Sequence, residues 1–183
     1  GRRRDQNPQD KQKIMALFKP TVMRDRLCDL NADTLKKLGV KGLVLDVDNT
    51  LSRHFDKMPF EGIDAFLKEM RDSGIKLIIL SNSPKSRVEP FAKKLNLDFE
   101  YKAKKPLTGG MKKALCKTGL EKDEVMLCGD QLFTDMLCGN LFGVKTLLVS
   151  PVHAERGAGF KIKRFLEKPF LSRYRKNKGD KIL

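Results

Sequence analysis

The chain has little of the chemistry that stabilises small secreted or zinc-binding proteins. Its 183 residues include no tryptophan, only two histidines and only four cysteines. The cysteines form no CxxC pair, which is the usual spacing of zinc-binding cysteines. Only two histidines are available to bind zinc together with them. We therefore expect no disulfide framework and no zinc site. We predict that the cysteines are small buried side chains in a reducing compartment: Cys28, Cys116, Cys128 and Cys138.

Long hydrophobic runs are also absent. The longest uninterrupted apolar stretches have about half the length that a membrane-spanning helix needs. The first residues, GRRRDQNPQDKQK, are basic and polar and lead into no long apolar segment, so they do not resemble a secretory signal. We therefore expect a cytoplasmic protein without a transmembrane helix, with a single folded domain.

Acidic residues are scarce at the two ends of the chain. Residues 1–30 carry eight basic and four acidic side chains, and residues 151–183 carry ten and three, within a formal net charge of +15. Such ends favour an anionic partner, either lipid headgroups or nucleic acid, although they can also serve solubility. We predict a basic extension over 1–30, the domain over 31–155, and a basic amphipathic tail over 156–183. The tail could bind a membrane, pack on the domain or mediate assembly.

Strand and helix patterns alternate through the middle of the chain. Short aliphatic runs at 42–46, 75–80, 124–128 and 144–149 lack polar alternation, which indicates strands buried on both faces, and a weaker strand fits 98–103. Helical patterns occupy 31–39, 60–74, 85–96 and 107–120. This alternation predicts a doubly wound, Rossmann-like α/β fold, a parallel sheet with helices on both faces. In such a fold ligands bind beyond the carboxyl ends of the strands.

Reactive side chains occur where the predicted strands end. Two or more carboxylates that meet at one edge repel each other unless a cation compensates them, and oxygen ligands suit Mg²⁺. A bound Mg²⁺ can neutralise charge on a phosphoryl group. The sequence therefore predicts a magnesium-dependent phosphoryl-transfer site built from Asp46, Asp48, Thr50, Ser81, Asn82, Lys105, Asp130 and Asp135.

The two aspartates of the first strand end can divide the reaction. Asp46 would attack phosphorus and form an aspartyl phosphate, and Asp48 would give a proton to the leaving oxygen and later take one from water. The Ser81 hydroxyl and nearby backbone N–H groups would hold the phosphate oxygens, and Lys105 would add a positive charge. We expect the substrate to be bound by Thr50, Ser81, Asn82 and Lys105.

These residues stand in four motifs that resemble those of the haloacid dehalogenase (HAD) superfamily of phosphatases. They are DxDxT from Asp46, the serine after LIIL, the lysine before Pro106, and GDxxxxD from Gly129. The resemblance implies that Asp46 also ligates the metal, that Asp48 offers it a backbone carbonyl, and that Asp130 is a further ligand. Asp135 would support the site. Lys104 competes with Lys105 for the lysine position, and we prefer the residue next to Pro106.

A closer resemblance covers about Leu17 to Lys168. The stretches LGVKGLVLDVDNTL, LIILSNS, YKAKKP and CGDQLFTDMLCGNLFGVKTLLVSPV look like the YqeG-type (subfamily IIIA) branch of HAD phosphatases. That branch is similar to the mitochondrial phosphatidylglycerophosphatase, which implies phosphatidylglycerophosphate as substrate. The short spacings between the motifs leave no room for the cap domains of other members. The site should therefore be open, as in members with large substrates.

The leading hypothesis is a peripheral phosphatase that acts on a phospholipid headgroup at the inner face of a membrane. A nucleic-acid end or nucleotide phosphatase, a soluble small-molecule phosphatase and a non-catalytic adaptor remain alternatives. We expect His54 and His153 to face solvent. Lys85 and Arg87 could reach a second phosphate or an anionic surface.

Overall fold

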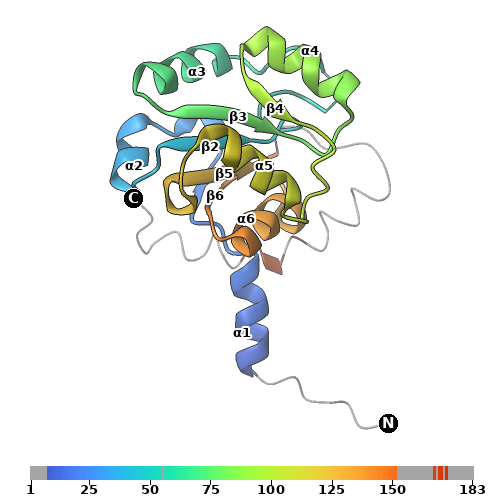
Figure 1. The fold of residues 1–183 in the computed structure, drawn as a ribbon. Helices are drawn as coiled ribbons and strands as arrows, with labels where there is room; N and C mark the ends of the chain where they lie inside the picture. Colours follow the sequence, from blue (N-terminus) through green and yellow to red (C-terminus); the bar gives the residue numbers. More distant parts are fainter. Residues whose placement is uncertain (1–7, 55, 152–166, 168, 171, 173–183) are drawn as a thin grey trace.

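The computed structural model describes residues 8–54, 56–151, 167, 169, 170 and 172. Within them, six parallel strands form one sheet in the order β1-β6-β5-β2-β3-β4. The helices pack on both faces of this sheet (Figure 1), which confirms the predicted doubly wound α/β fold. The strands are β1 Val22–Arg24, β2 Gly42–Leu45, β3 Lys76–Leu80, β4 Asp98–Glu100, β5 Val125–Gly129 and β6 Lys145–Val149.

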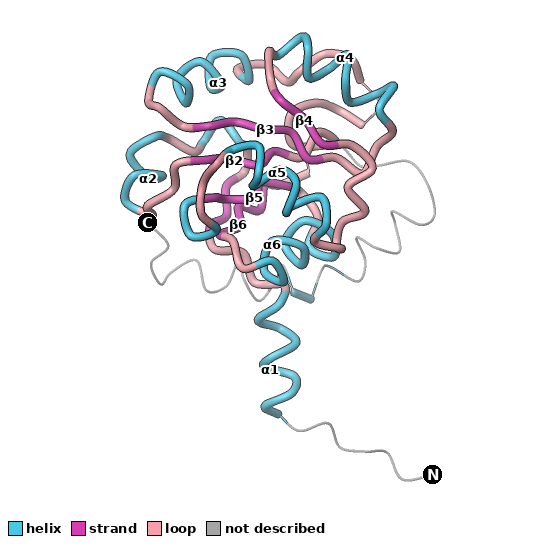
Figure 2. Tube along the Cα trace, viewed as in Figure 1, coloured by secondary structure: helices cyan, strands magenta, loops and turns pink. Residues whose placement is uncertain are grey.

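The helices alternate with the strands along the chain (Figure 2). Asn31 caps the first predicted helix, its side chain accepting a hydrogen bond from the Thr34 N–H at 2.8 Å. Pro90 does not end its helix, which continues to Leu95. The helices are α1 Pro8–Leu17, α2 Ala32–Lys37, α3 Ile63–Asp72, α4 Lys85–Leu95, α5 Gly109–Thr118 and α6 Leu137–Phe142, with short turns η1 Leu27–Asp29, η2 Lys122–Glu124 and a π-helical η3 Leu132–Met136.

The side chains of the central strands divide between two cores, one on each face of the sheet. On β2, Leu43 and Leu45 belong to the core that α3 and α4 cover, whereas Val44 belongs to the core with α5. All three side chains are fully buried. This explains why β2 lacks polar alternation, because neither face of it meets water.

The cysteines form no disulfide and are not all buried. Cys128 on β5 and Cys138 on α6 are buried as predicted, and Cys28 is partly buried. Cys116 is exposed on α5, so the prediction of a buried side chain was wrong there. Its helical pattern fixed the element but not the face of the helix on which the cysteine lies.

The first thirty residues contribute to the sheet. β1 pairs with β6, and the Thr21 N–H donates to the Thr146 carbonyl at 3.0 Å. These residues lie inside the stretch that we assigned to a basic extension, so the folded body starts before residue 31. The outer limits of the three predicted segments stay predictions. α1 projects from the body below α6 (Figure 1), where Asn140 donates to the carbonyls of Leu17 and Lys19.

Two of the described residues of the tail, Glu167 and Phe170, pack on the folded domain. Phe170 lies against Phe18 and Phe133, with ring centroids 5.3 and 5.9 Å away. The buried Glu167 accepts a hydrogen bond from the Leu132 N–H at 3.0 Å. His153 and most of the predicted amphipathic tail lie outside the described residues. Among the described helices, none combines the length and hydropathy needed to cross a bilayer.

The order of the strands creates a switch point at the centre of the sheet. From β2 the chain moves outward to β3 and β4, then returns to β5 on the other side of β2 and moves on to β6. The connections after β2 and β5 therefore diverge at their carboxyl ends. In doubly wound sheets this is the place where ligands bind.

Candidate active site

Three carboxylates meet at the switch point between β2 and β5. Asp46 directly follows β2, and its N–H donates to the Cys128 carbonyl of β5 at 2.9 Å, so the two strands stay paired up to the site. Asp130 follows β5, and Asp135 comes from η3. One oxygen of each carboxylate lies within 4.8 Å of those of the other two, and all three residues are buried. The sheet thus brings Asp46 together with two acids that lie 84 and 89 residues later in the sequence, as the motifs predicted.

Lys105 supplies a positive charge among these acids. Its Nζ lies 2.7 Å from Asp46 Oδ1, 2.6 Å from Asp135 Oδ1 and 3.0 Å from the Leu80 carbonyl oxygen. Burial alone would lower the pKa of Lys105, but the two carboxylates outweigh it and raise that pKa, so the ammonium stays charged. Lys104 is exposed. The geometry therefore favours Lys105 over Lys104 for the predicted lysine position.

The charge balance of the cluster favours a further cation. Burial, with a smaller contribution from Asp135, raises the pKa of Asp46 to about 7 against the lowering effect of Lys105. One ammonium thus faces three buried carboxylates and does not fully compensate them. A divalent cation that carboxylate oxygens bind would favour the ionised form of Asp46. The donor set therefore fits the predicted Mg²⁺.

Asp135 is fixed by the backbone around it. Its Oδ2 accepts a hydrogen bond from the Gln131 N–H at 3.1 Å, while its Oδ1 pairs with Lys105. The close approach to β5 requires Gly129, because a Cβ at that position would lie 2.3 Å from the Asp135 Cγ. Both oxygens of Asp135 thus serve the surrounding structure, which agrees with the supporting role that the resemblance implied.

Asn82 lies at the site, where its side chain binds the backbone of Lys105. Its Oδ1 accepts from the Lys105 N–H at 2.7 Å, and its Nδ2 donates to the Lys105 carbonyl at 3.1 Å. Both ends of the amide therefore hold the backbone of the lysine, whereas we had expected the side chain to bind substrate. A single polar residue after a strand carries no sequence signal that separates these two tasks.

Ser81 and Thr50 are buried at the same edge. The Ser81 hydroxyl accepts a hydrogen bond from the Ser83 N–H at 3.2 Å. The Thr50 hydroxyl is buried without a hydrogen-bond partner among the described residues. Thr50 lies in the loop after β2 and Ser81 directly follows β3. Their substrate-binding role stays a prediction.

Asp48 stands apart from the acid cluster and has its own partners. Arg87 Nη2 donates to Asp48 Oδ1 at 2.6 Å, and the Ser83 hydroxyl donates to Oδ2 at 3.3 Å. The side chain of Asp48 is thus not among the three grouped carboxylates. The predicted role of Asp48 as acid and base stays a prediction.

Two neighbours of Asp48 were not predicted as such. His54 Nδ1 lies 3.5 Å from Asp48 Oδ1 and its side chain is 24% exposed, so the expectation that it faces solvent was wrong. From the sequence, Arg87 could reach a second phosphate or an anionic surface, and in the structure it binds Asp48. Arg87 lies near the start of α4, which follows β3. This position is the one sequence signal that placed Arg87 at the same edge of the sheet as Asp48.

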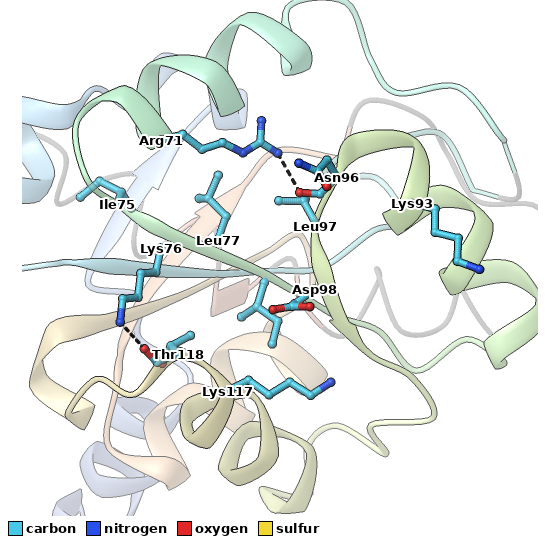
Figure 3. A pocket seen from close by; sticks show the side chains of 11 residues that line it. Arg71, Ile75, Lys76, Leu77, Lys93, Asn96, Leu97, Asp98, Lys117 and Thr118 are labelled. Atoms are coloured by element: carbon cyan, nitrogen blue, oxygen red, sulfur yellow. Dashed lines mark hydrogen bonds between the residues drawn. The ribbon is translucent and has the colours of Figure 1, made fainter.

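The opposite edge of the sheet has a pocket of about 540 Å³ that does not belong to this site (Figure 3). Two of its four cationic side chains bind carbonyls at helix ends: Arg71 donates to the Leu95 carbonyl at 2.6 Å, and Lys76 donates to the Thr118 carbonyl at 2.6 Å. The other two have acidic partners, Lys93 with Glu89 and Lys117 with Glu100. None of the predicted site residues lines it. We therefore assign it a structural role, since its cations either satisfy carbonyls at helix C-termini or pair with neighbouring carboxylates.

Comparisons with known proteins agree with the geometry. The family model described as mitochondrial PGP phosphatase matches residues 10–153. The probable phosphatase YqeG of Bacillus subtilis is 33% identical over 159 residues, which cover 87% of this chain and 92% of that protein.

Solved structures show the same fold at lower identity. A haloacid dehalogenase-like hydrolase from Brucella suis superposes with a TM-score of 0.50 at 13% identity, over 63% of this chain and 91% of the other. An uncharacterized protein from Listeria monocytogenes gives a TM-score of 0.52 at 16% identity, over 64% and 85% of the two chains. At these identities the likeness concerns the fold alone.

Proposed function

The chain belongs to the mitochondrial PGP phosphatase family of the HAD superfamily, and on that premise we propose that it is a Mg²⁺-dependent phosphatidylglycerophosphate phosphatase at a membrane surface. Phosphatase chemistry follows from the family. The substrate, the metal and the membrane are our proposal. The observation that supports it best is the buried Asp46 carboxylate, 2.7 Å from Lys105 Nζ and grouped with Asp130 and Asp135.

Asp46 is the proposed nucleophile. Its carboxylate would attack phosphorus and displace the leaving oxygen, which forms an aspartyl phosphate that water then hydrolyses. Lys105 holds Asp46 Oδ1 in place and adds positive charge beside the incoming phosphoryl group. Asn82 fixes the backbone of Lys105 through two hydrogen bonds, so the lysine is positioned before the substrate arrives.

Asp46 and Asp130 are the proposed side-chain ligands of Mg²⁺, with Asp135 close enough to support them and the backbone carbonyl of Asp48 as a further ligand. When bound, the ion supplies charge neutralisation to the phosphoryl oxygens. The chain contributes the rest: Asp135 holds Lys105, and Gly129 leaves room for Asp135.

Asp48 is the proposed acid and base. Its carboxyl group would give a proton to the leaving oxygen in the first step and take one from the attacking water in the second. Arg87 and Ser83 fix the two oxygens of this carboxyl group. A fixed orientation matters here, because proton transfer requires hydrogen-bond distance to the reacting oxygen.

The open edge of the site supports a large substrate. Between Asp46 and Lys105 the described residues form only loops, α3, β3, α4 and β4, with no inserted cap domain. The basic ends of the chain would attract anionic lipid headgroups, at about 1 kcal/mol per Lys or Arg near the surface. A capless site and a basic surface together favour a substrate that stays in the bilayer.

A panel of phosphorylated substrates tests this proposal. Phosphate release is measured from phosphatidylglycerophosphate in anionic vesicles, from an end-phosphorylated oligonucleotide and from soluble monoesters, each with Mg²⁺ or EDTA and with Asp46→Asn as the blank. We expect Mg²⁺-dependent release that is fastest from the lipid. Turnover of the oligonucleotide or of soluble esters while the lipid stays intact would overturn the assignment of the substrate.

A further inference from the structure

A groove lies beside the proposed acid Asp48. It lies between α4 and Lys57, which belongs to the described loop residues 56–59; Pro59 of this loop pairs with Ser52 in an isolated bridge. Its volume is about 540 Å³. It is lined by Lys57, Ser86, Arg87, Pro90, Phe91 and Lys94.

Arg87 connects this groove to the reacting groups. One nitrogen of its guanidinium, Nη2, donates to Asp48 Oδ1 at 2.6 Å, and the other, Nη1, donates to the Asp56 carbonyl at 3.0 Å. The same side chain lines the groove. Arg87 therefore binds Asp48 through one guanidinium nitrogen and the Asp56 carbonyl through the other, while its side chain lines the groove.

The position of Asp48 determines where a leaving group must lie. The oxygen that departs has to come within hydrogen-bond distance of the acid that protonates it. The rest of the leaving group then extends past Asp48 and away from the Asp46–Lys105 pair. On that side the described residues present Arg87 and the groove that it lines.

The charge of the groove is positive. Three of its six lining residues are cationic, and no carboxylate lines it among the described residues. Arg87 is paired with Asp48, so the positive charge of the groove comes mainly from Lys57 and Lys94. Lys94 Nζ donates to the Met58 thioether at 2.7 Å, which is a weak acceptor and leaves the charge of the ammonium uncompensated. Glu89 of the same helix pairs with Lys85 and Lys93 instead, 3.9 and 3.2 Å away.

We propose that this groove is a subsite for the leaving group of the substrate and that it selects a leaving group with a second, phosphodiester charge. Lys57, Lys94 and Arg87 would face the diester, the Ser86 hydroxyl would bind a glycerol hydroxyl, and Pro90 and Phe91 would contact its carbon atoms. The inference rests on the proposed function, since it takes Asp46 as nucleophile and Asp48 as acid.

Two soluble substrates test the subsite without any membrane. Glycerol 3-phosphate has an uncharged leaving group, whereas the deacylated form of phosphatidylglycerophosphate leaves as the phosphodiester glycerophosphoglycerol. The variants are Lys57→Met, Lys94→Met and the double variant, with Lys113→Met as control, an exposed lysine on α5 across the sheet. The measured quantity is kcat/KM for each substrate with Mg²⁺.

We expect the wild type to prefer the diester substrate. Each single variant should lower kcat/KM for that substrate about threefold, and the double variant about tenfold, as for charge pairs near a surface. Glycerol 3-phosphate should be turned over at the wild-type rate by all of them. A double variant that keeps the full preference for the diester overturns the subsite.

A binding measurement separates this inference from the proposed function. Glycerophosphoglycerol itself is titrated into isotope-labelled protein, and the amide signals of residues 57, 86 and 94 are followed by NMR. Shifts in the wild type that the double variant loses support the subsite even if neither ester is hydrolysed, in which case only the proposed reaction falls. Absence of shifts at these residues in the wild type counts against the subsite.

Discussion

At the scale of single residues, Asp46 is the group whose properties decide the chemistry. Asp46→Asn removes the nucleophile and leaves a side chain of the same shape beside Lys105. We expect phosphate release to fall at least about 10³-fold, the order found when covalent catalysis is removed, while the far-ultraviolet circular dichroism stays that of the wild type. Normal turnover by this variant would contradict the proposed mechanism.

The raised pKa of Asp46 predicts how stability depends on pH. In the folded, metal-free protein the pKa of the Asp46 carboxyl group is about 7, above its ordinary value of 3.8. The folded state therefore binds the Asp46 proton more tightly than the unfolded state does. The stability that this proton contributes is fully present below pH 3.8 and is lost as the pH rises through about 7. We expect Mg²⁺ to raise the melting temperature more at pH 8 than at pH 5.5.

Thermal unfolding with Mg²⁺ and with EDTA at the two pH values measures this effect. Asp46→Asn is the control, since an amide does not titrate and should respond to Mg²⁺ alike at both pH values. Equal stabilisation of the wild type by Mg²⁺ at pH 5.5 and pH 8 would show that no proton competes with the ion.

Arg87 gives a prediction about positioning. Arg87→Met removes the 2.6 Å contact to Asp48 and the contact to the Asp56 carbonyl while keeping the apolar stem. Because Asp48 then loses its orientation, we expect kcat to fall about tenfold to a hundredfold, within the range of general acid catalysis. A substrate with a good leaving group, such as p-nitrophenyl phosphate, should lose less, since it needs less protonation.

At the scale of elements, Gly129 at the end of β5 leaves the space that the Asp135 side chain occupies. Gly129→Ala would place a Cβ 2.3 Å from the Asp135 Cγ, so η3 must shift. We expect the free energy of unfolding to fall by about 1–3 kcal/mol, as for overpacked cores, and activity to fall with the displaced Asp135–Lys105 pair. Gly109→Ala is the control, because a Cβ there meets nothing within 4 Å. Similar losses in both variants would refute the steric argument.

The sequence predicted the buried elements well and the marginal ones poorly. The strands β2, β3, β5 and β6 were found because burial on both faces leaves an uninterrupted aliphatic run. β1 has three residues, VMR, and was missed because so short a strand has no period and depends on pairing with β6. The helix of Asn31 was found from its cap, which is a local signal.

The same division holds for the site. Asp46 and Asp130 follow predicted strands and Lys105 precedes a predicted helix, so these three meet as predicted. Asp135 was found from its motif alone, since it lies within η3, which the sequence did not predict. The partners of Asp48 were not predicted, since Arg87 and His54 reach it from α4 and from the loop after β2 by side-chain direction. Contacts between side chains of separate loops depend on tertiary packing that a linear pattern does not record.

At the scale of the whole molecule, charge is the property that the proposed membrane docking requires. The basic residues are concentrated at the two ends of the chain, with a net charge of +15 overall. Because salt screens exposed charges, we expect co-sedimentation with anionic vesicles to weaken as NaCl rises from about 0.05 to 0.5 M. Hydrolysis of glycerol 3-phosphate should change little over that range, and neutral vesicles serve as the control. Binding that does not depend on salt would exclude an electrostatic attachment.

The place of the site within the sheet has a consequence for local motion. Asp46 and Asp130 follow β2 and β5, each of which has a neighbour on both sides, whereas the outermost strands β1 and β4 have three residues each. Fraying should therefore begin at the margins and reach the reacting groups last. In hydrogen–deuterium exchange the amides of β1 and β4 should exchange well before those of β2 and β5. The outer strands can therefore open locally while Asp46, at the end of β2, keeps its position.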